Sequence, residues 1–207
     1  MNNSIFKASR QLRSLFRVLC ALTVLFFVSG PCLAGGRVYV WAWFHTEDYV
    51  EPAADDATLR LAEELRGRGV RATFKLVGEK VRALESRGRQ DVIRALSFHD
   101  IGYHGDNHSI PPAPAVYLRD MGWLDGAAEF ERRERPGVAD LRRIFGMTPS
   151  CYASPGNSWG PQSLRALLRL GIPVNLRGAG AAMPQLYWFR TSLETSPGNA
   201  SRSTVGW

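Results

Sequence analysis

Cysteine is scarce in this sequence of 207 residues, which has only three. Cys20 and Cys32 lie in an N-terminal segment with the features of a targeting signal, and only Cys151 follows it. A single cysteine excludes an intramolecular disulfide, even in an oxidising compartment. Stability must therefore come from a hydrophobic core, and the 173 residues after position 34 suffice for one domain with such a core.

The apolar run near the N-terminus, Val18–Val28, is too short to span a bilayer comfortably. No acid precedes it, and the small-x-small sequence Cys32-Leu33-Ala34 follows it. Its basic residues are Lys7, Arg10, Arg13 and Arg17. This pattern predicts an export signal over residues 1–34, with an uncleaved membrane anchor as the alternative. We expect a periplasmic, extracellular or envelope-associated protein that meets a membrane only through an uncleaved N-terminal segment.

Acidic residues are fewer than basic ones, 19 against 26, and the formal net charge is +7. Removal of the four basic residues of the N-terminal segment lowers this charge to +3. The basic character is therefore partly a targeting feature and is weak evidence for nucleic-acid binding. We expect a monomer with no nucleic-acid partner.

Apolar runs alternate with helical patterns along the rest of the chain. Strands are expected at residues 37–44, 70–77, 101–104, 150–153, 172–176 and 186–189. Helices are expected at residues 57–67, 79–86, 90–96, 125–135, 138–145 and 162–170, with Pro136 interrupting or kinking the fourth pattern. The alternation predicts an α/β fold with parallel strands, the first buried and central. Residues 35–190 would form one domain, and residues 191–207, which lack any period, an irregular tail.

Three of the four histidines lie between residues 99 and 108. His104 and His108 follow the third expected strand at a spacing that lets two imidazoles converge. Glu47 and Asp48 follow the first strand, and in parallel βα units such strand ends share one face. One carboxylate and two imidazoles suit Zn²⁺, or Co²⁺, Mn²⁺ or Fe²⁺, and a water bound to such an ion becomes a nucleophile at neutral pH.

Each feature alone has an ordinary structural explanation. A pair of histidines four apart also arises by coincidence, adjacent acids often cap a helix, and Pro155-Gly156 is a common turn. Adjacent side chains on a strand point to opposite sides, so one acid of the pair Glu47-Asp48 can ligate while the other acts as a base. The backbone at the strand end decides between them. His99 is expected to be structural.

Two segments, residues 71–81 and 98–108, resemble the NodB-homology polysaccharide deacetylases (carbohydrate esterase family 4 and relatives). The family strand A-T-F-F-V-x-G is similar to Ala72–Gly78, and the family motif H-E-I-G-x-H-x-x-x-H is similar to His99–His108. The resemblance covers roughly residues 37–176. It implies a distorted, incomplete (β/α) barrel and a metal-dependent hydrolase that removes N- or O-acetyl groups from a polysaccharide or related glycan.

The resemblance also implies roles for single residues. His45–Asp48 occupies the family's first motif, which implies Glu47 as the catalytic base and Asp48 as a metal ligand beside His104 and His108. The implied cofactor is a divalent metal, foremost Zn²⁺. The third motif falls around Pro155, and the expected glycan contacts are Tyr152, Pro155, Gly156, Asn157 and Trp159. Aromatic rings that could stack on sugars, or simply pack, are Tyr49, Tyr103, Tyr152 and Trp159.

Three departures from the family pattern bear on activity. Glu47 is one methylene longer than the family's aspartate, and Ala153 or Ser154 stands where the third motif has an arginine. No histidine follows His108, although the family supplies a late histidine as general acid. An inactive carbohydrate-binding protein on the same scaffold is therefore the alternative hypothesis, and a truncated product without a stable fold is a third.

Overall fold

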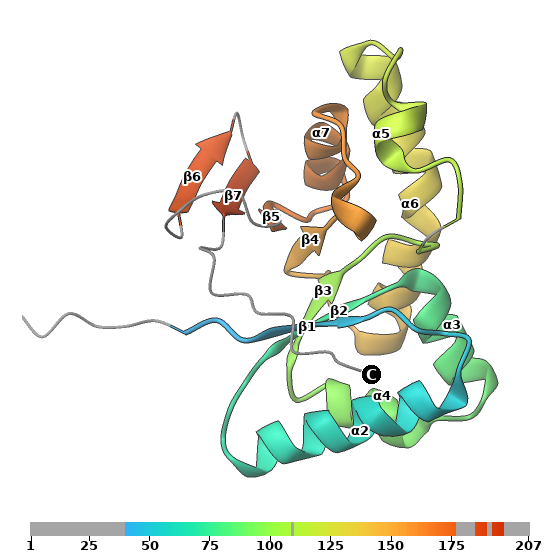
Figure 1. The fold of residues 1–207 in the computed structure, drawn as a ribbon, viewed down its shortest axis with the longest axis vertical. Coiled ribbons are helices and arrows are strands. Elements are labelled where there is room, and N and C mark those ends of the chain that lie inside the picture. The colour runs from blue at the N-terminus through green and yellow to red at the C-terminus, as the bar shows by residue number, and fades with distance from the viewer. Residues whose placement is uncertain (1–39, 109, 177–184, 190–191, 197–207) are drawn as a thin grey trace, which may run out of the picture. The chain divides into compact units, whose positions relative to one another are not determined.

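The computed structural model describes residues 40–108, 110–176, 185–189 and 192–196 (Figure 1). Five parallel strands follow the order of the chain: β1 (Trp43–Thr46), β2 (Thr73–Leu76), β3 (Asp100–Tyr103), β4 (Cys151–Ala153) and β5 (Val174–Leu176). A sheet that adds each new strand on the same side winds in one direction, as a (β/α) barrel does. The described sheet has two ends, so the barrel is not closed. The predicted α/β class and incomplete barrel are confirmed.

Two further strands continue the sheet beyond β5. β7 (Ser192–Ser196) pairs parallel with β5, and β6 (Gln185–Phe189) pairs antiparallel with β7. The expected strand at 186–189 is confirmed. The expectation of an irregular tail is wrong for residues 192–196. These residues form strand β7, whose backbone pairs with β5 on one side and with β6 on the other. Their sequence has no apolar period that would have predicted a strand. Residues 197–207 and the expected export signal, residues 1–34, lie outside the described residues.

The helices lie beside the sheet as one layer (Figure 1). In the described chain they are α2 (Pro52–Gly67), α3 (Gly78–Ser86), α4 (Gln90–Leu96), α5 (Pro114–Tyr117), α6 (Trp123–Phe145) and α7 (Gln162–Arg169). Contacts join α2 to α4, α4 to α3, α3 to α6 and α6 to α7. Right-handed crossovers between successive parallel strands place all connecting helices on one face. None of these helices combines the length and apolar character that a membrane span requires.

Three boundaries differ from the sequence expectations. α2 begins at Pro52 rather than at residue 57, because proline fits the first helical turn. α6 runs through Pro136, which is exposed and removes only one backbone donor. β1 is an edge strand of the described sheet, not a buried central one, and its start at Trp43 leaves Val40 87% exposed.

The main core lies between the sheet and the helix layer. Strand residues Phe74, Ile101 and Tyr103 are almost fully buried there, against helix residues that include Leu84, Leu96, Phe130 and Leu141. The opposite face of the same strands carries polar residues, since side chains alternate along a strand. In register across that face lie His45, Lys75 and Gly102. His45 lies on this second face, and His104 and His108 follow the carboxyl end of β3.

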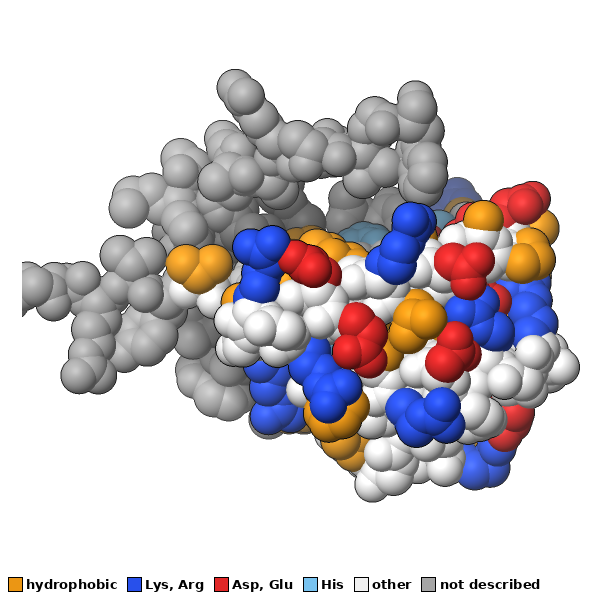
Figure 2. All heavy atoms as spheres, turned by 90° about the horizontal axis from the view of Figure 1, so that it is seen from below, with side chains coloured by type: hydrophobic (Ala, Val, Ile, Leu, Met, Phe, Trp, Pro, Cys, Tyr) orange, Lys and Arg blue, Asp and Glu red, His pale blue; other side chains and the backbone are white. Residues whose placement is uncertain are grey.

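The face that carries α2 has charges of both signs (Figure 2). Ion pairs along this helix join Arg66 to Glu63 and Arg68 to Glu64. Pairs of this exposed kind contribute little to stability, typically about 0–1 kcal/mol. The positive charge of the chain does not gather into a basic patch on this face (Figure 2).

Candidate functional site

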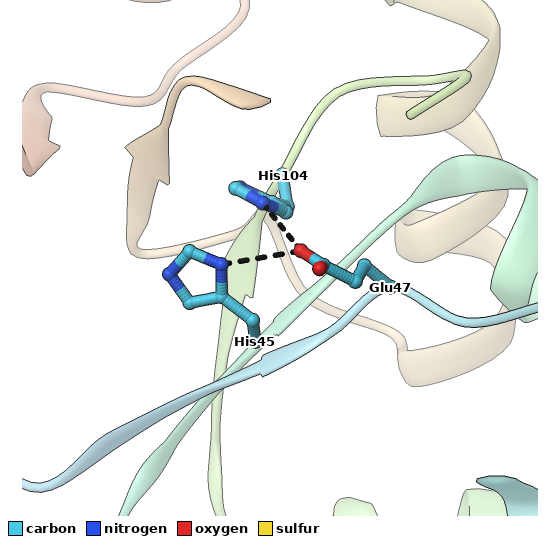
Figure 3. Close-up of side chains that lie close together, drawn as sticks. All are labelled: His45, Glu47 and His104. Atoms are coloured by element: carbon cyan, nitrogen blue, oxygen red, sulfur yellow. Dashed lines mark hydrogen bonds and ion pairs between the residues drawn. The ribbon is translucent and has the colours of Figure 1, made fainter. Parts of the chain in front are cut away.

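Three imidazoles surround one carboxylate oxygen at the carboxyl ends of β1 and β3. Oε2 of Glu47 lies 3.0 Å from Nε2 of His104, 3.2 Å from Nδ1 of His45 and 3.3 Å from Nε2 of His108. Figure 3 shows the first two of these contacts. His45 belongs to β1 and Glu47 follows it, while His104 and His108 belong to the loop after β3. The expected meeting of strand ends therefore brings Glu47, His104 and His108 together.

His104 is held from behind by β4. Its Nδ1 lies 2.7 Å from the backbone carbonyl oxygen of Ala153, so Nδ1 carries a proton and donates it. Its side chain is fully buried, and burial lowers the pKa of His104 although the contact with Glu47 acts in the opposite direction. The neutral ring consequently presents the Nε2 lone pair to the site.

The contact between His104 and Glu47 suits a cation. Nε2 of the neutral His104 ring and the carboxylate oxygen of Glu47 are both acceptors, yet they lie 3.0 Å apart. Nε2 of His108 faces the same oxygen at 3.3 Å. Facing acceptors are stabilised only by a positive group between them, either a proton or a metal ion. One carboxylate and two imidazoles are a common ligand set for Zn²⁺ and similar divalent ions, so these residues fit the metal that the resemblance implies.

A second ligand set overlaps with the first. Ligand atoms of His45, Glu47 and His104 all lie within 4.8 Å of one another, which is also compatible with a metal ion. Glu47 and His104 are common to both sets, and His45 and His108 are the alternatives. His45 differs from His108 in having the ammonium nitrogen of Lys75 2.8 Å from its Nε2.

Asp48 lies outside this cluster. Its Oδ1 accepts hydrogen bonds from the backbone N–H groups of Val50 and Glu51, at 2.9 and 3.0 Å, and so caps the turn before α2. The structure therefore places Glu47, and not Asp48, beside His104 and His108, whereas the resemblance implies Asp48 as the ligand and Glu47 as the base. The backbone at the end of β1 thus directs the two adjacent acids to different surroundings.

Two groups of the site have lowered pKa values, for different reasons. The contacts with His104 and then with His45 hold the pKa of Glu47 well below its usual range, although partial burial opposes this effect. Burial lowers the pKa of Lys75 to about 7, while the nearby Glu47 carboxylate acts to raise it. The ring of His45 therefore lies between the carboxylate of Glu47, which its Nδ1 contacts, and the buried amine of Lys75, which its Nε2 contacts.

The expected glycan contacts divide into two groups. Pro155, Gly156 and Asn157 form a short turn after β4, and Gly156 and Asn157 have φ values of 55° and 56°, in the left-handed region. Gly156 and Asn157 are exposed beside the site's strand ends, whereas Pro155 and Trp159 are half-buried. Tyr152 cannot contact a glycan, because it is fully buried in the core against Phe130.

Other aromatic and histidine residues have structural positions. Tyr103 is fully buried, so its ring packs in the core and is closed to a sugar. His99 is structural, as expected: Nδ1 accepts from the backbone N–H of Ala72, and Nε2 donates to the carbonyl oxygen of Ala62. Tyr49 is half-buried beside the start of α2.

Sequence reasoning missed His45 and Lys75. The signal for Lys75 is a lone cation inside the apolar run Thr73–Leu76, where every residue is buried. The signal for His45 is its position two residues before Glu47, which places both side chains on the same side of an extended chain. Neither signal reveals the contact between them, which depends on the register of β1 with β2.

Comparisons with known proteins agree with this architecture. The fold matches that of a "putative polysaccharide deacetylase" from Mycobacterium smegmatis, with a TM-score of 0.51 and 17% identity over 75% of this chain and 56% of that chain. The fold is the one found in polysaccharide deacetylases. A family 4 acetyl xylan esterase from Clostridium thermocellum, in complex with a cobalt ion, matches at a TM-score of 0.44 and 18% identity over 68% of this chain and 58% of that one.

A family 4 pseudoenzyme from Bacillus anthracis also matches, with a TM-score of 0.45 and 14% identity over 68% of this chain and 44% of that one. This chain thus spans about half the length of the solved deacetylase structures. No protein-family model and no curated protein matches the sequence. A fold hosts many chemistries, so the deacetylase fold does not by itself establish an activity.

Proposed function

We propose that this chain is a metal-dependent hydrolase that removes acetyl groups from a polysaccharide or related glycan. The observation that supports the proposal most is the meeting of Glu47, His104 and His108 around one carboxylate oxygen. Their place at the carboxyl ends of parallel strands is where (β/α) folds carry their active sites. The deacetylase-like fold and the two sequence motifs are consistent with this chemistry.

The proposed ligands of the metal are Glu47, His104 and His108. Zn²⁺ suits this set best, and Co²⁺, Mn²⁺ and Fe²⁺ are the other candidates. A divalent ion held by these residues would supply a water of near-neutral pKa and would polarise the acetyl carbonyl. The protein's part is to keep the ligands in place, and the carbonyl group of Ala153 does so for His104.

The proposed glycan site is the exposed turn after β4. Gly156 and Asn157 present backbone and amide groups to the face on which the metal ligands lie, and Pro155 and Trp159 flank them. Pro155 lies close to the loop after β3, where a Cβ on Gly105 would be 3.0 Å from its ring. A rigid turn of this kind can orient an acetylated sugar beside the ligands.

Acetate release tests the proposal. The full chain is incubated with acetylated chitooligosaccharide or peptidoglycan, with Zn²⁺ and then with a chelator. We expect release that the chelator stops and that added Zn²⁺ restores. The variant His104→Asn should release no acetate above background, and Asp48→Asn, which keeps an oxygen to cap the turn, should retain activity. Absence of metal-dependent release on both substrates would contradict the proposal.

A second candidate function is glycan binding without turnover. It is favoured by one feature of the sequence, the absence of an arginine from residues 152–156. Under this hypothesis, the glycan binds with similar affinity with and without chelator, and no acetate is released. The assay above therefore separates the two functions when it is combined with a binding measurement on the same oligosaccharide.

A further inference from the structure

Two side chains from α3 and its end hold the short loop between β1 and α2. Lys80 lies in α3, and Arg87 directly follows the last residue of that helix. Nζ of Lys80 donates to the carbonyl oxygen of Asp48 at 2.5 Å. Nη2 of Arg87 donates to the carbonyl oxygens of Tyr49 and Val50, at 2.8 and 3.0 Å. Successive carbonyl groups of the loop are thus bound by side chains of another element.

A buried carboxylate fixes both of these donors. Asp55, in the first turn of α2, has no exposed surface, and Lys80 is buried as well. Oδ1 of Asp55 accepts from Nζ of Lys80 at 2.5 Å, and Oδ2 accepts from Nη1 of Arg87 at 3.0 Å. Buried charged groups are costly unless they are paired and hydrogen-bonded, so these side chains have little freedom to leave one another. We call Asp55, Lys80 and Arg87 the loop clasp.

Glu47 lies between two fixed points of the chain. On one side is Thr46, which is buried and pairs with Leu76 as the last residue of β1. On the other side is Asp48, whose carbonyl oxygen is bound by Lys80. Rotation about the backbone bonds of Glu47 would displace the carbonyl group of Asp48 from the buried amine. The direction of the Glu47 side chain therefore depends on the loop clasp.

Helix α3 also holds the loop that carries both histidine ligands. The N–H groups of Gly78 and Glu79, at the start of the helix, donate to the carbonyl oxygens of Gly105 and Asp106, both at 2.9 Å. One helix is therefore attached to the loop after β1 and to the loop after β3. The distance between the carboxylate and the imidazoles depends on both attachments.

We propose that the loop clasp is a set of positioning residues that directs Glu47 toward His104 and His108. It acts through the backbone of the loop after β1. The inference rests on the proposed metal site and adds to it the residues that keep its carboxylate ligand in place. Removal of such outer partners typically lowers metal affinity by about 10–100-fold, and we expect a loss in this range.

Two variants of the full chain and one matched control test the proposal. Arg87→Met removes a side chain that is 28% exposed, so the fold should tolerate it. Lys80→Met together with Asp55→Asn removes both members of the buried ion pair, because removal of one alone leaves a charge unpaired. Arg142→Met is the control, since Arg142 likewise donates to a backbone carbonyl oxygen, that of Leu170 at the end of α7.

Amide hydrogen exchange without metal shows whether the loop clasp holds the loop. The N–H groups of Val50 and Glu51 both donate to Oδ1 of Asp48 and report on the order of the loop. We expect these amides to exchange about tenfold faster in Arg87→Met and in the double variant, and at the original rate in Arg142→Met. Unchanged exchange in both clasp variants would overturn the proposal.

Zinc affinity, measured by calorimetry at a temperature where every variant is folded, shows whether the clasp positions a ligand. A change in global stability alone leaves the affinity of a fully folded chain unchanged. We expect a loss of about 10–100-fold in both clasp variants and of no more than about threefold in Arg142→Met. Because the clasp acts through Glu47, adding Arg87→Met to Glu47→Gln should cause no further loss.

The other outcomes separate this inference from the proposed function. Original zinc affinity in both clasp variants would overturn the inference and leave the metal site standing, as would an undiminished effect of Arg87→Met in the Glu47→Gln background. If the original chain binds no zinc, the proposed metal site is overturned, and the inference falls with it. If the double variant does not fold, Arg87→Met decides alone.

Discussion

At the scale of single residues, partners fix what each titratable side chain can do. His104 presents a lone pair at Nε2 because its Nδ1–H donates to the carbonyl oxygen of Ala153, and His99 has the reverse tautomer because the N–H of Ala72 donates to its Nδ1. Glu47 and Asp48 are neighbours in sequence, yet one meets three imidazoles and the other caps a turn. Their order could not be predicted from the sequence, because it depends on the backbone direction at one strand end.

Glu134, which lies away from the site, is another titratable side chain whose behaviour is set by its surroundings. It lies inside α6 and is nearly fully buried, and its Oε2 accepts from the Tyr103 hydroxyl at 2.7 Å and the Asp106 N–H at 2.8 Å. Burial raises the pKa of Glu134 to about 7, although both hydrogen bonds oppose the shift. The folded chain therefore holds this proton more tightly than the unfolded chain does.

This raised pKa predicts a pH-dependent stability. Between about pH 4.5 and pH 7 the folded state binds more protons at Glu134 than the unfolded state, so stability falls as the pH rises, by about 3 kcal/mol in all. Glu134→Gln keeps an oxygen that accepts both hydrogen bonds and removes the charge. We expect its gain in stability over the original chain to grow through this pH range, measured by urea unfolding. A constant difference at all pH values, or the same trend in the control Glu131→Gln, would argue against this account.

At the scale of elements, the sequence predicted where helices and strands occur better than it predicted their first and last residues. The helix at 162–169 and the strand at 185–189 follow clear patterns, and their outcomes agree with the expectations. β1 and β2 are shorter than their apolar runs, because a strand lasts only as long as a neighbour pairs with it. Helix α6 continues past Pro136, since its packing against α3 and α7 outweighs one lost hydrogen bond.

The approach of α3 to α6 depends on a residue without a side chain. A Cβ on Gly78 would lie 2.3 Å from Oδ1 of Asp106 and 2.7 Å from Cα of Gly137. Gly78→Ala should therefore lower the free energy of unfolding by about 1–3 kcal/mol, as overpacked substitutions do. Gly67→Ala, whose Cβ would meet nothing within 4 Å, is the matched control and should be neutral or slightly stabilising. Equal urea midpoints for the two variants would show that α3 and α6 can move apart without a loss of stability, which would contradict this prediction.

At the scale of the whole molecule, one arrangement connects fold and site. Parallel strands in chain order bring the segments after β1, β3 and β4 to one edge, and this much follows from alternating strand and helix patterns. The pair His104 and His108 could be predicted because it lies in one short motif. His45 and Lys75 could not, because their contact forms only when β1 and β2 pair in the observed register.

Zinc titration calorimetry on Glu47→Gln and Asp48→Asn, beside the original chain, tests the central claim most directly. The account places Glu47 among the ligands and Asp48 in the turn before α2. It predicts one zinc ion bound by the original chain, a loss of affinity of more than about 100-fold in Glu47→Gln, and a change of no more than about threefold in Asp48→Asn. Circular dichroism melts verify that both variants fold. Loss of zinc binding in Asp48→Asn with affinity retained in Glu47→Gln would contradict the account.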